Sequence, residues 1–336
     1  MTELISKVAN SFSGKCVVIA GDLVADQFLS GSISRVSREA PVFILRHEET
    51  ETRPGGAANA AANIASLGGT PVVVGYLGDD DNGRLLLNGL GKLGVECGNV
   101  VQSSEVTTTT KVRVLAGQSY SVKQQVIRID YENSGGVSAD LEKRLIASIE
   151  RSAVSADAIV VSDYGYGVVT KALFDAALKA ATVRSIPMIV DSRFRLLEFR
   201  GATSATPNQE EVEQLLGSNF TDSDCLKLRD ELGLDSLLVT CGNKGMILVE
   251  RDGSIQRIPA IGPTEPVDVT GAGDTVIAAY SLGLASGLVP REAAAVANHA
   301  GGIVVMKKGT ATVSSEELSH SLASHTGAIS DKAAQK

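Results

Sequence analysis

Short apolar runs rich in valine and isoleucine alternate along this chain with segments in which apolar residues recur at helical spacing. Each run predicts a buried strand, and each intervening segment predicts a helix. This order is typical of an α/β domain whose mostly parallel sheet is covered by helices on both faces. The predicted strands are Cys16–Ala20, Pro71–Tyr76, Ala158–Val161, Pro187–Val190 and Ser236–Thr240, and the predicted helices are Ala57–Leu67, Arg84–Leu93, Ala139–Arg151, Lys171–Ala181, Gln209–Leu216 and Asp222–Leu232.

Two segments, Gly31–Glu51 and Glu105–Tyr131, break this order, because polar and apolar residues alternate in them with no helix between. A period of two predicts half-exposed strands, here of a small second sheet. An extension at the edge of the main sheet would give the same pattern, so both arrangements stay open. The last residues, 321–336, are polar and small, which predicts a frayed tail.

Composition narrows the class of protein. The chain has 336 residues, of which 43% are hydrophobic, and a formal net charge of -8. No apolar run approaches the length of a membrane span, and residues 1–14 lack the regions of a secretory leader, so we expect no membrane partner. The negative charge, without a basic cluster, argues against a nucleic-acid partner. Four scattered cysteines predict neither a zinc site nor a disulfide framework, and hence a reducing, cytoplasmic setting.

The strongest chemical signal is the stretch from Val267 to Thr275, where a loop enters an apolar helix. Gly271 and Gly273 allow the backbone to approach a ligand closely, and the first turn of the helix offers amides and a positive dipole end to an anion. Asp274 in that turn is placed to accept a proton from a hydroxyl beside the anion. Phosphoryl transfer to an alcohol needs this combination. An ordinary capped helix start would have a similar composition.

A second group of candidates consists of polar residues that follow predicted strands. In an α/β sheet, ligands bind at the carboxyl ends of the strands, so these side chains are expected to meet at one edge. Each of them could alone be a helix cap. They are Asp22, Asp163, Asp191, Asn208 and Thr240.

Two long segments carry a resemblance to a known family. Asp268-Val269-Thr270-Gly271-Ala272-Gly273-Asp274-Thr275 resembles the C-terminal signature of the ribokinase-like sugar kinases, the PfkB family, and the segment from Arg53 to Gly68 resembles its N-terminal signature. The resemblance runs in the family's order from Gly21 to Thr310. It implies an α/β fold of three layers (αβα), with a mostly parallel central sheet and a small β-sheet lid. It further implies one kinase domain over residues 1–320, lid strands within 31–51 and 105–131, and a homodimer contact through the lid.

The resemblance also implies roles for the residues of the signatures. Asp274 would be the general base, and Gly271, Ala272 and Gly273 would form an anion hole for the phosphoryl group of Mg-ATP. Asp22, Gly55, Gly56 and Asn59 would contact the sugar. Tight helix packing is the alternative reading of the small residues that follow Arg53.

Three shorter matches imply a nucleotide half. Thr206-Pro207-Asn208-Gln209-Glu210-Glu211 resembles the family's Asn-x-x-Glu element, so Asn208 and Glu211 would position phosphates and Mg²⁺, with Glu211 acting through water. Glu210 could equally be a charge at a helix N-terminus. The turn holding Thr240, Gly242 and Gly245 would lie against phosphates and ribose, and Asn298 would lie next to adenine. Asp268 and Thr270 would hold a monovalent cation such as K⁺.

Within the family, the chain resembles the heptose 7-phosphate kinases in three places: residues 34–41, 53–56 and 124–130. Cations are frequent in the predicted lid, and arginine forks suit a phosphate already on the substrate, so Arg113 and Arg128 are candidate substrate ligands. Solvated strand residues are the alternative. The chain departs from that subfamily at Ser162-Asp163-Tyr164-Gly165-Tyr166-Gly167, where a lysine is missing, and at Asp191-Ser192-Arg193.

The sequence therefore predicts an ATP-dependent sugar kinase that acts on O1 of a heptose 7-phosphate. A kinase for another sugar, sugar phosphate or nucleoside (ribose, fructose or fructose 6-phosphate) stays open. A non-catalytic regulator that binds sugar or nucleotide is the alternative from another class. The intact Asp274 favours catalysis, since a pure binder needs no base.

Overall fold

The computed structural model describes residues 11–118, 123–133, 136–263 and 265–334. Residues 1–10, on which most of the prediction about a secretory leader rests, lie outside the described residues. The central sheet has nine strands in the order β13-β12-β11-β10-β9-β8-β1-β4-β5. All neighbours from β5 to β11 are parallel, and β12 and β13 are antiparallel. The strands are β1 (Cys16–Gly21), β4 (Thr70–Gly78), β5 (Val100–Ser103), β8 (Ala158–Asp163), β9 (Met188–Ser192), β10 (Ser204–Ala205), β11 (Ser236–Thr240), β12 (Met246–Glu250) and β13 (Ile255–Ile258).

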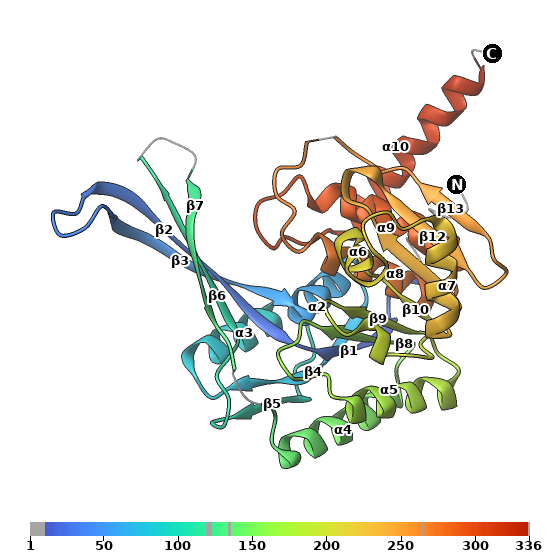
Figure 1. The fold of residues 1–336 in the computed structure, drawn as a ribbon, viewed down its shortest axis with the longest axis horizontal. Coiled ribbons are helices and arrows are strands. Elements are labelled where there is room, and N and C mark those ends of the chain that lie inside the picture. Colours follow the sequence, from blue (N-terminus) through green and yellow to red (C-terminus); the bar gives the residue numbers. More distant parts are fainter. Residues whose placement is uncertain (1–10, 119–122, 134–135, 264, 335–336) are drawn as a thin grey trace.

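Helices cover both faces of this sheet, which confirms the predicted three layers (Figure 1). The strands are buried on both sides: in β1, Val17 and Ile19 join one apolar core, and Val18 and Ala20 join the other. The first core also holds α2 (Ala57–Ser66), α3 (Asp81–Lys92), α8 (Ala272–Ala285), α9 (Pro290–Val304) and α10 (Ser315–Ala334). The second holds α4 (Ala139–Ala153), α5 (Lys171–Arg184), α6 (Gln209–Leu216) and α7 (Asp222–Leu232).

The lid is a separate four-stranded sheet that projects from the domain (Figure 1). Its order is β3-β2-β6-β7, with β2 (Leu23–Val36), β3 (Phe43–Gly56), β6 (Thr110–Gly117) and β7 (Gln124–Tyr131). The alternative of an edge extension is therefore wrong. The lid also begins earlier than predicted. Residues 23–25 are all buried near the domain, so polar and apolar residues do not alternate there and the sequence pattern does not indicate a lid strand.

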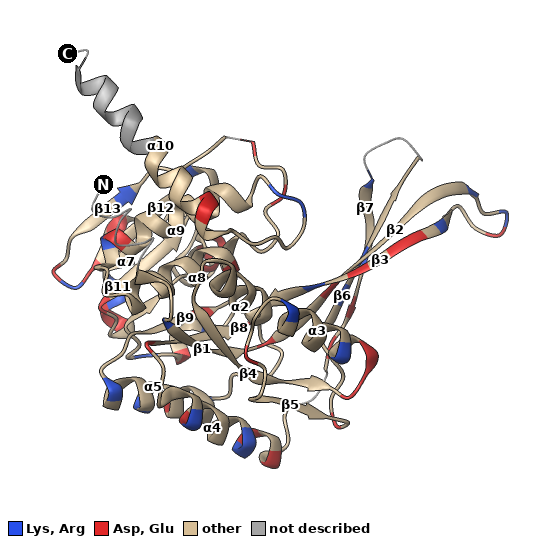
Figure 2. Cartoon of the chain, turned by 180° about the vertical axis from the view of Figure 1, so that it is seen from behind, with Lys and Arg blue, Asp and Glu red and all other residues tan. Residues whose placement is uncertain are grey.

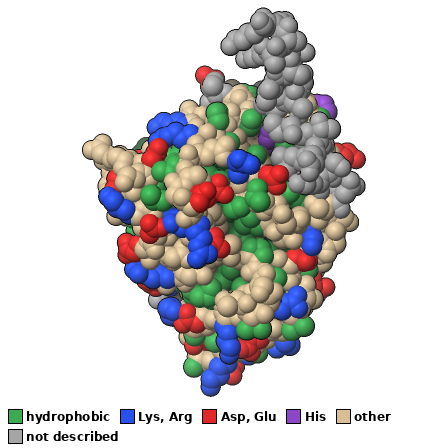
Figure 3. Space-filling model, turned by 90° about the vertical axis from the view of Figure 1, so that its right-hand side faces the viewer, with side chains coloured by type: hydrophobic (Ala, Val, Ile, Leu, Met, Phe, Trp, Pro, Cys, Tyr) green, Lys and Arg blue, Asp and Glu red, His purple; other side chains and the backbone are tan. Residues whose placement is uncertain are grey.

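The predicted boundary at residue 320 falls inside α10. Leu318 and Leu322, on either side of it, are both buried in the first core. Among the described residues, no helix has the length and apolar content needed to cross a bilayer. On the face seen in Figure 3, acidic and basic side chains are interspersed around apolar ones, so that face carries no patch of a single sign.

Candidate active site

The loop before α8 turns through Gly271, which has a φ of 76° and is the N-cap residue of the helix. A Cβ at this position would lie 2.5 Å from Nδ2 of Asn59, so only glycine fits. The turn aims the amides of the first helical turn at a pocket lined by Gly271, Ala272 and Gly273. The structure thus brings the predicted anion-binding residues together at a helix N-terminus.

Asp274 is buried in the first turn of α8, with an exposed fraction of 3%. Its Oδ2 accepts a hydrogen bond of 2.8 Å from Nδ2 of Asn59, and its Oδ1 accepts one of 2.6 Å from the hydroxyl of Tyr164. Burial raises the pKa of Asp274 to about 6, against the lowering effect of these two donors. The helix N-terminus alone would favour a low pKa, so burial outweighs it. At neutral pH the group is still mainly a carboxylate, as a base must be.

Asn59 lies on α2, and its side chain contacts the N-terminal turn of α8. Its Nδ2 is bonded to Asp274 and also lies 3.5 Å from the carbonyl oxygen of Gly271. Its Oδ1 accepts from Nδ2 of Asn63 at 3.3 Å. Asn59 thus holds one oxygen of the Asp274 carboxylate, and its predicted contact with the sugar stays a prediction.

Gly55 and Gly56 also make room for protein groups. A Cβ on Gly55 would lie 2.5 Å from Oδ2 of Asp26, and one on Gly56 would lie 2.7 Å from the carbonyl oxygen of Asp22 and 3.4 Å from the ring of Tyr164. Both glycines thus allow a close approach, of the Asp26 side chain to Gly55 and of the Asp22 backbone and the Tyr164 ring to Gly56.

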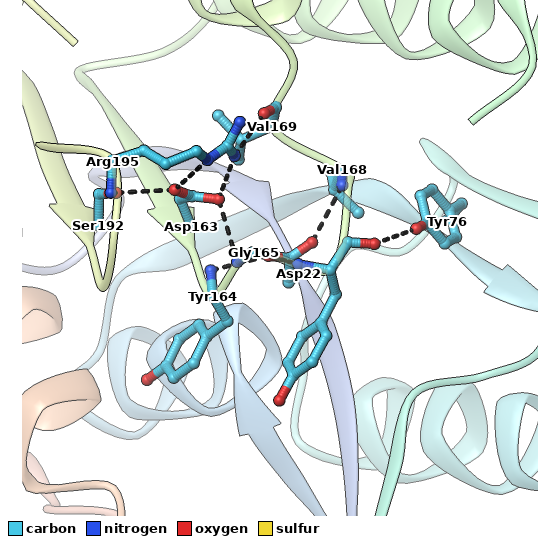
Figure 4. A network of polar contacts seen from close by, with 10 residues as sticks. Asp22, Tyr76, Asp163, Tyr164, Gly165, Val168, Val169, Ser192 and Arg195 are labelled. Carbon is cyan, nitrogen blue, oxygen red and sulfur yellow. Dashed lines mark hydrogen bonds and ion pairs between the residues drawn. The ribbon is translucent and has the colours of Figure 1, made fainter. Parts of the chain in front are cut away.

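Asp22 is buried between β1 and β2, and its carboxylate holds the loop after β8 (Figure 4). Oδ2 accepts from the amides of Tyr164 and Tyr166 at 2.7 and 3.1 Å, and Oδ1 accepts from that of Val168 at 3.0 Å. Burial raises the pKa of Asp22 to about 6, although the three amides oppose the shift. Each oxygen of Asp22 thus accepts from at least one backbone amide, and the sugar contact of this residue stays a prediction.

Asp26, four residues further on, is a site carboxylate that the sequence reasoning missed. It lies in the lid strand β2, is buried, and its Oδ1 is 3.0 Å from Nη2 of Arg113. Its neighbours across the lid are Arg53 on β3 and Lys111 on β6. The sequence does contain a signal for Asp26: a carboxylate lies within the apolar run that starts at Leu23, and a buried carboxylate needs a partner.

The two predicted arginines of the lid differ in surroundings. Arg113 is largely buried, pairs with Asp26, and its Nε has no hydrogen-bond partner in the described part of the chain. Arg128 lies beside it on β7 but is exposed and paired with Asp130. Figure 2 shows an acidic stretch on β3 and basic positions on the neighbouring parts of the lid. Arg113 also lines a pocket under the lid that holds further cations; these are Arg53, Lys123 and Lys308.

Four of the predicted nucleotide residues line a cavity of about 180 Å³ between β11 and α9; they are Thr240, Gly242, Gly245 and Asn298. Thr240, Gly242 and Gly245 form one side, and apolar groups such as Ile261 form much of the rest. Asn298 also lines it, but its Nδ2 donates to the carbonyl oxygen of Pro259 at 2.7 Å and so holds the cavity wall. Apolar walls with few polar groups are typical of a site for a planar base.

An acidic pocket joins this cavity to Asp274. Asn208 and Glu211 cap α6 reciprocally: Oδ1 of Asn208 accepts from the amide of Glu211, and the Glu211 carboxylate accepts from that of Asn208, both at 2.9 Å. Burial raises the pKa of Glu211, and burial together with Glu211 and Asp274 raises that of Asp191. Carboxylates that disfavour each other's charge suit a cation between them.

No group of three or more acidic, His or Cys residues within the described ranges is arranged to hold a metal ion directly. The role of Glu211 toward Mg²⁺ through water therefore stays a prediction. The same holds for the monovalent cation at Asp268 and Thr270. Burial raises the pKa of Asp268, but bonds from the amides of Thr270 and Gly309 outweigh it and leave that pKa below its ordinary value.

The chain is similar to known proteins in both sequence and fold. Residues 29–318 match the model of the pfkB family carbohydrate kinases. Two relatives, each described as bifunctional protein HldE, come from Azorhizobium caulinodans, with 38% identity over 308 residues, and Citrifermentans bemidjiense, with 39% over 307. The matches cover 90% of this chain in both cases and 63% and 62% of those proteins, so the chain spans somewhat less than two thirds of their length.

Two solved structures share the fold. Phosphofructokinase-2 from Escherichia coli, in complex with potassium, has a TM-score of 0.75 and 20% identity, covering 92% of this chain and 98% of that one. Ribokinase from Arabidopsis thaliana, complexed with ribose and ATP, has a TM-score of 0.70 and 22% identity, covering 92% and 99%.

Proposed function

This chain belongs to the pfkB family of carbohydrate kinases, and on that basis we propose that it transfers the γ-phosphoryl group of ATP to a sugar hydroxyl with Asp274 as the base. The observation that carries the proposal is the position of Asp274. It is buried beside the anion-binding turn of α8 and lines the acidic pocket that leads to the nucleotide cavity.

The residues of the site divide the chemistry between them. The first-turn amides at Gly271–Gly273 stabilise the charge on the transferred group, and they cost no reorganisation because the helix already fixes them. Asp274 takes the proton of the attacking hydroxyl, which leaves late in a loose transition state. Asn59 and Tyr164 hold its two oxygens.

Mg²⁺, when bound, would neutralise charge on the triphosphate. The acidic pocket fits a cation of this kind, and Glu211 and Asn208 would hold it through water, with Asp191 beside them. Arg193 is the one cationic side chain among the described residues that line this pocket, and it would contact the phosphates. Asp268 and Thr270 are the candidate residues for binding K⁺. A phosphofructokinase-2 of the same fold was solved in complex with potassium, which supports this choice of ion.

For the acceptor, we propose a sugar phosphate, and specifically O1 of a heptose 7-phosphate. Arg113, whose Nε has no hydrogen-bond partner among the described residues, and Lys308 of the same pocket offer a phosphate site beside Asp26. Two further cations of this pocket, Arg53 and Lys123, are paired with Glu51 and Glu48, and a phosphate would compete for them. Arg128 is a weaker candidate, because it is exposed, whereas Arg113 is largely buried. The resemblance to heptose 7-phosphate kinases and the identity to HldE proteins support the same choice.

We further propose that the lid forms a homodimer contact in a cytoplasmic enzyme. The lid strand β7 lies at the edge of its sheet and exposes apolar side chains, a combination that favours pairing with another chain. The exposed apolar residues are Val126, Ile127, Ile129 and Tyr131. The four free thiols of the described residues suit a reducing compartment.

ADP release from Mg-ATP, measured with a panel of acceptors, tests the proposal. The panel is heptose 7-phosphate, sedoheptulose 7-phosphate, fructose 6-phosphate, fructose, ribose and adenosine. Turnover confined to heptose 7-phosphate supports the full proposal, whereas turnover on an unphosphorylated sugar keeps the kinase and overturns the acceptor. Asp274→Asn should lower kcat on the order of 10²–10⁴-fold and leave ATP affinity within about threefold. A variant that keeps most of its rate would show that Asp274 is not the base.

A further inference from the structure

The geometry assigns Tyr164 as a positioning residue for the catalytic base: its hydroxyl donates to Oδ1 of Asp274, fixes the orientation of the carboxylate and favours its charged form. This inference rests on the proposed role of Asp274. Tyr164 lies in the segment Ser162–Gly167, which the nucleotide and sugar assignments leave without a role.

The base is held from two sides. The hydroxyl of Tyr164 lies 2.6 Å from Oδ1, and Nδ2 of Asn59 lies 2.8 Å from Oδ2. A short bond to an ionised oxygen is among the stronger hydrogen bonds in proteins. Each carboxylate oxygen has a second lone pair, and Asp274 lines the acidic pocket, so an acceptor hydroxyl can still reach it. With both oxygens fixed, the carboxylate cannot rotate away from that hydroxyl.

The placement of Tyr164 is built into the surrounding fold. Its amide is one of three that Asp22 binds, and Figure 4 shows its side chain leaving the loop away from the pair of Asp163 and Arg195. Gly56 leaves room for the ring, since a Cβ there would lie 3.4 Å from it. On the ring face, the Lys111 ammonium lies 5.7 Å from the centroid. Contacts from three separate elements thus define one position for the hydroxyl.

Tyr164 acts as a donor only. Burial, together with the charge of Asp274, raises the pKa of Tyr164 well above its ordinary value, so the hydroxyl keeps its proton. The acceptor's proton therefore goes to Asp274. Other charged groups act on the carboxylate from neighbouring elements: Asp26 on β2 raises its pKa and Lys111 on β6 lowers it, while Asp191 and Glu211 lie across the acidic pocket. Without the hydroxyl, the pKa of Asp274 would rise further, because one of the hydrogen bonds that oppose the effect of burial is lost.

Tyr164→Phe keeps the ring and removes this one hydrogen bond. We expect kcat to fall roughly 10–100-fold and the acid limb of the kcat/KM profile to move up by roughly one pH unit, because the charged form of the base loses a donor. The KM for ATP should stay within about threefold. The profile is measured between pH 5 and 9 with the best acceptor of the panel above.

Tyr76→Phe is the matched control. The Tyr76 hydroxyl donates to the carbonyl oxygen of Tyr166 at 2.6 Å, in the same loop but without a bond to Asp274. This variant should leave the acid limb in place. If Tyr164→Phe and Tyr76→Phe lose equal activity and neither moves the limb, the loop is only structural and the inference is overturned. An unchanged rate and profile for Tyr164→Phe overturns it as well.

The double variant separates this inference from the proposed function. On an Asp274→Asn background, Tyr164→Phe should cost little further activity, because the two residues act as one unit. Losses that multiply would contradict a role through Asp274. If the single variant Asp274→Asn keeps its turnover, the proposed role of Asp274 as the base is overturned, whatever the result for Tyr164→Phe.

Discussion

Arg113 and Asp26 form a largely buried ion pair on two neighbouring lid strands, with Nη2 of the arginine 3.0 Å from Oδ1 of the aspartate. Burial raises the pKa of Asp26, and the charges of Arg113 and then Lys111 oppose the shift. The pair joins the lid pocket to the region around Asp274, because Arg113 lines the former and the charge of Asp26 acts on the latter. We therefore expect this ion pair to couple the proposed acceptor site to Asp274.

Arg113→Ala should lower the free energy of unfolding by about 3 kcal/mol, because it leaves Asp26 buried without its partner. The KM for a phosphorylated acceptor should also rise, while that for ATP stays constant. Urea unfolding and steady-state kinetics measure the two effects. Arg128→Ala removes a neighbouring but exposed arginine and should change stability by less than about 1 kcal/mol. Equal losses in both variants would contradict the role given to burial.

The rate should depend on pH through Asp274. Its pKa is raised to about 6, so the charged form that accepts a proton is lost as the pH falls through that value. Above about pH 7 the kcat/KM should be level on this account, and below pH 6 it should fall about tenfold per unit. A profile that stays level down to pH 5 would show that Asp274 has an ordinary pKa or is not the base.

Asp22→Asn should disturb the loop that carries Tyr164. The amide keeps one acceptor oxygen where the carboxylate offers two, so at least one of the three backbone amides loses its partner. We expect a loss of about 1–3 kcal/mol in the free energy of unfolding and a lower kcat. Thermal unfolding and the steady-state rate provide the readouts; a variant with unchanged kcat would separate this loop from catalysis.

Gly271→Ala and Gly273→Ala test the geometry of the anion-binding turn. Gly271 has a positive φ, and a Cβ there would press on Asn59, so the first variant should lose at least about 1–2 kcal/mol of stability. A Cβ on Gly273 meets nothing within 4 Å, so the second should fold with stability close to that of the parent. Urea unfolding of the two variants side by side is the measurement. Equal destabilisation would mean that the turn is not as tight as described.

Much of the fold follows from local patterns, and the five predicted strands and six predicted helices all occur within a few residues of their expected bounds. These elements are long, strongly patterned and near caps or glycines, which are local signals. The start of the lid at Leu23 was missed because residues buried on both sides do not alternate. Periodicity reports which side of an element is buried, not which element covers it.

The sequence predicts which residues belong to the site better than it predicts which of them are in contact. Signature residues such as Gly271 and Asp274 are close in sequence, so spacing alone places them together. The bond between Tyr164 and Asp274 joins residues 110 positions apart, and no local pattern reports it. Asp22 and Asp26 lie on adjacent segments, and only the path of the backbone shows that one binds amides and the other faces arginine.

The junction between domain and lid has a mechanical consequence. The last residue of β1 is Gly21 and the first of β2 is Leu23, so at this one of several crossings a single residue, Asp22, joins the central sheet to the lid. A change in the angle of the lid would turn the backbone of Asp22, whose carboxylate binds the loop that carries Tyr164. We therefore expect the lid angle to affect the orientation of the Asp274 carboxylate, which Tyr164 holds.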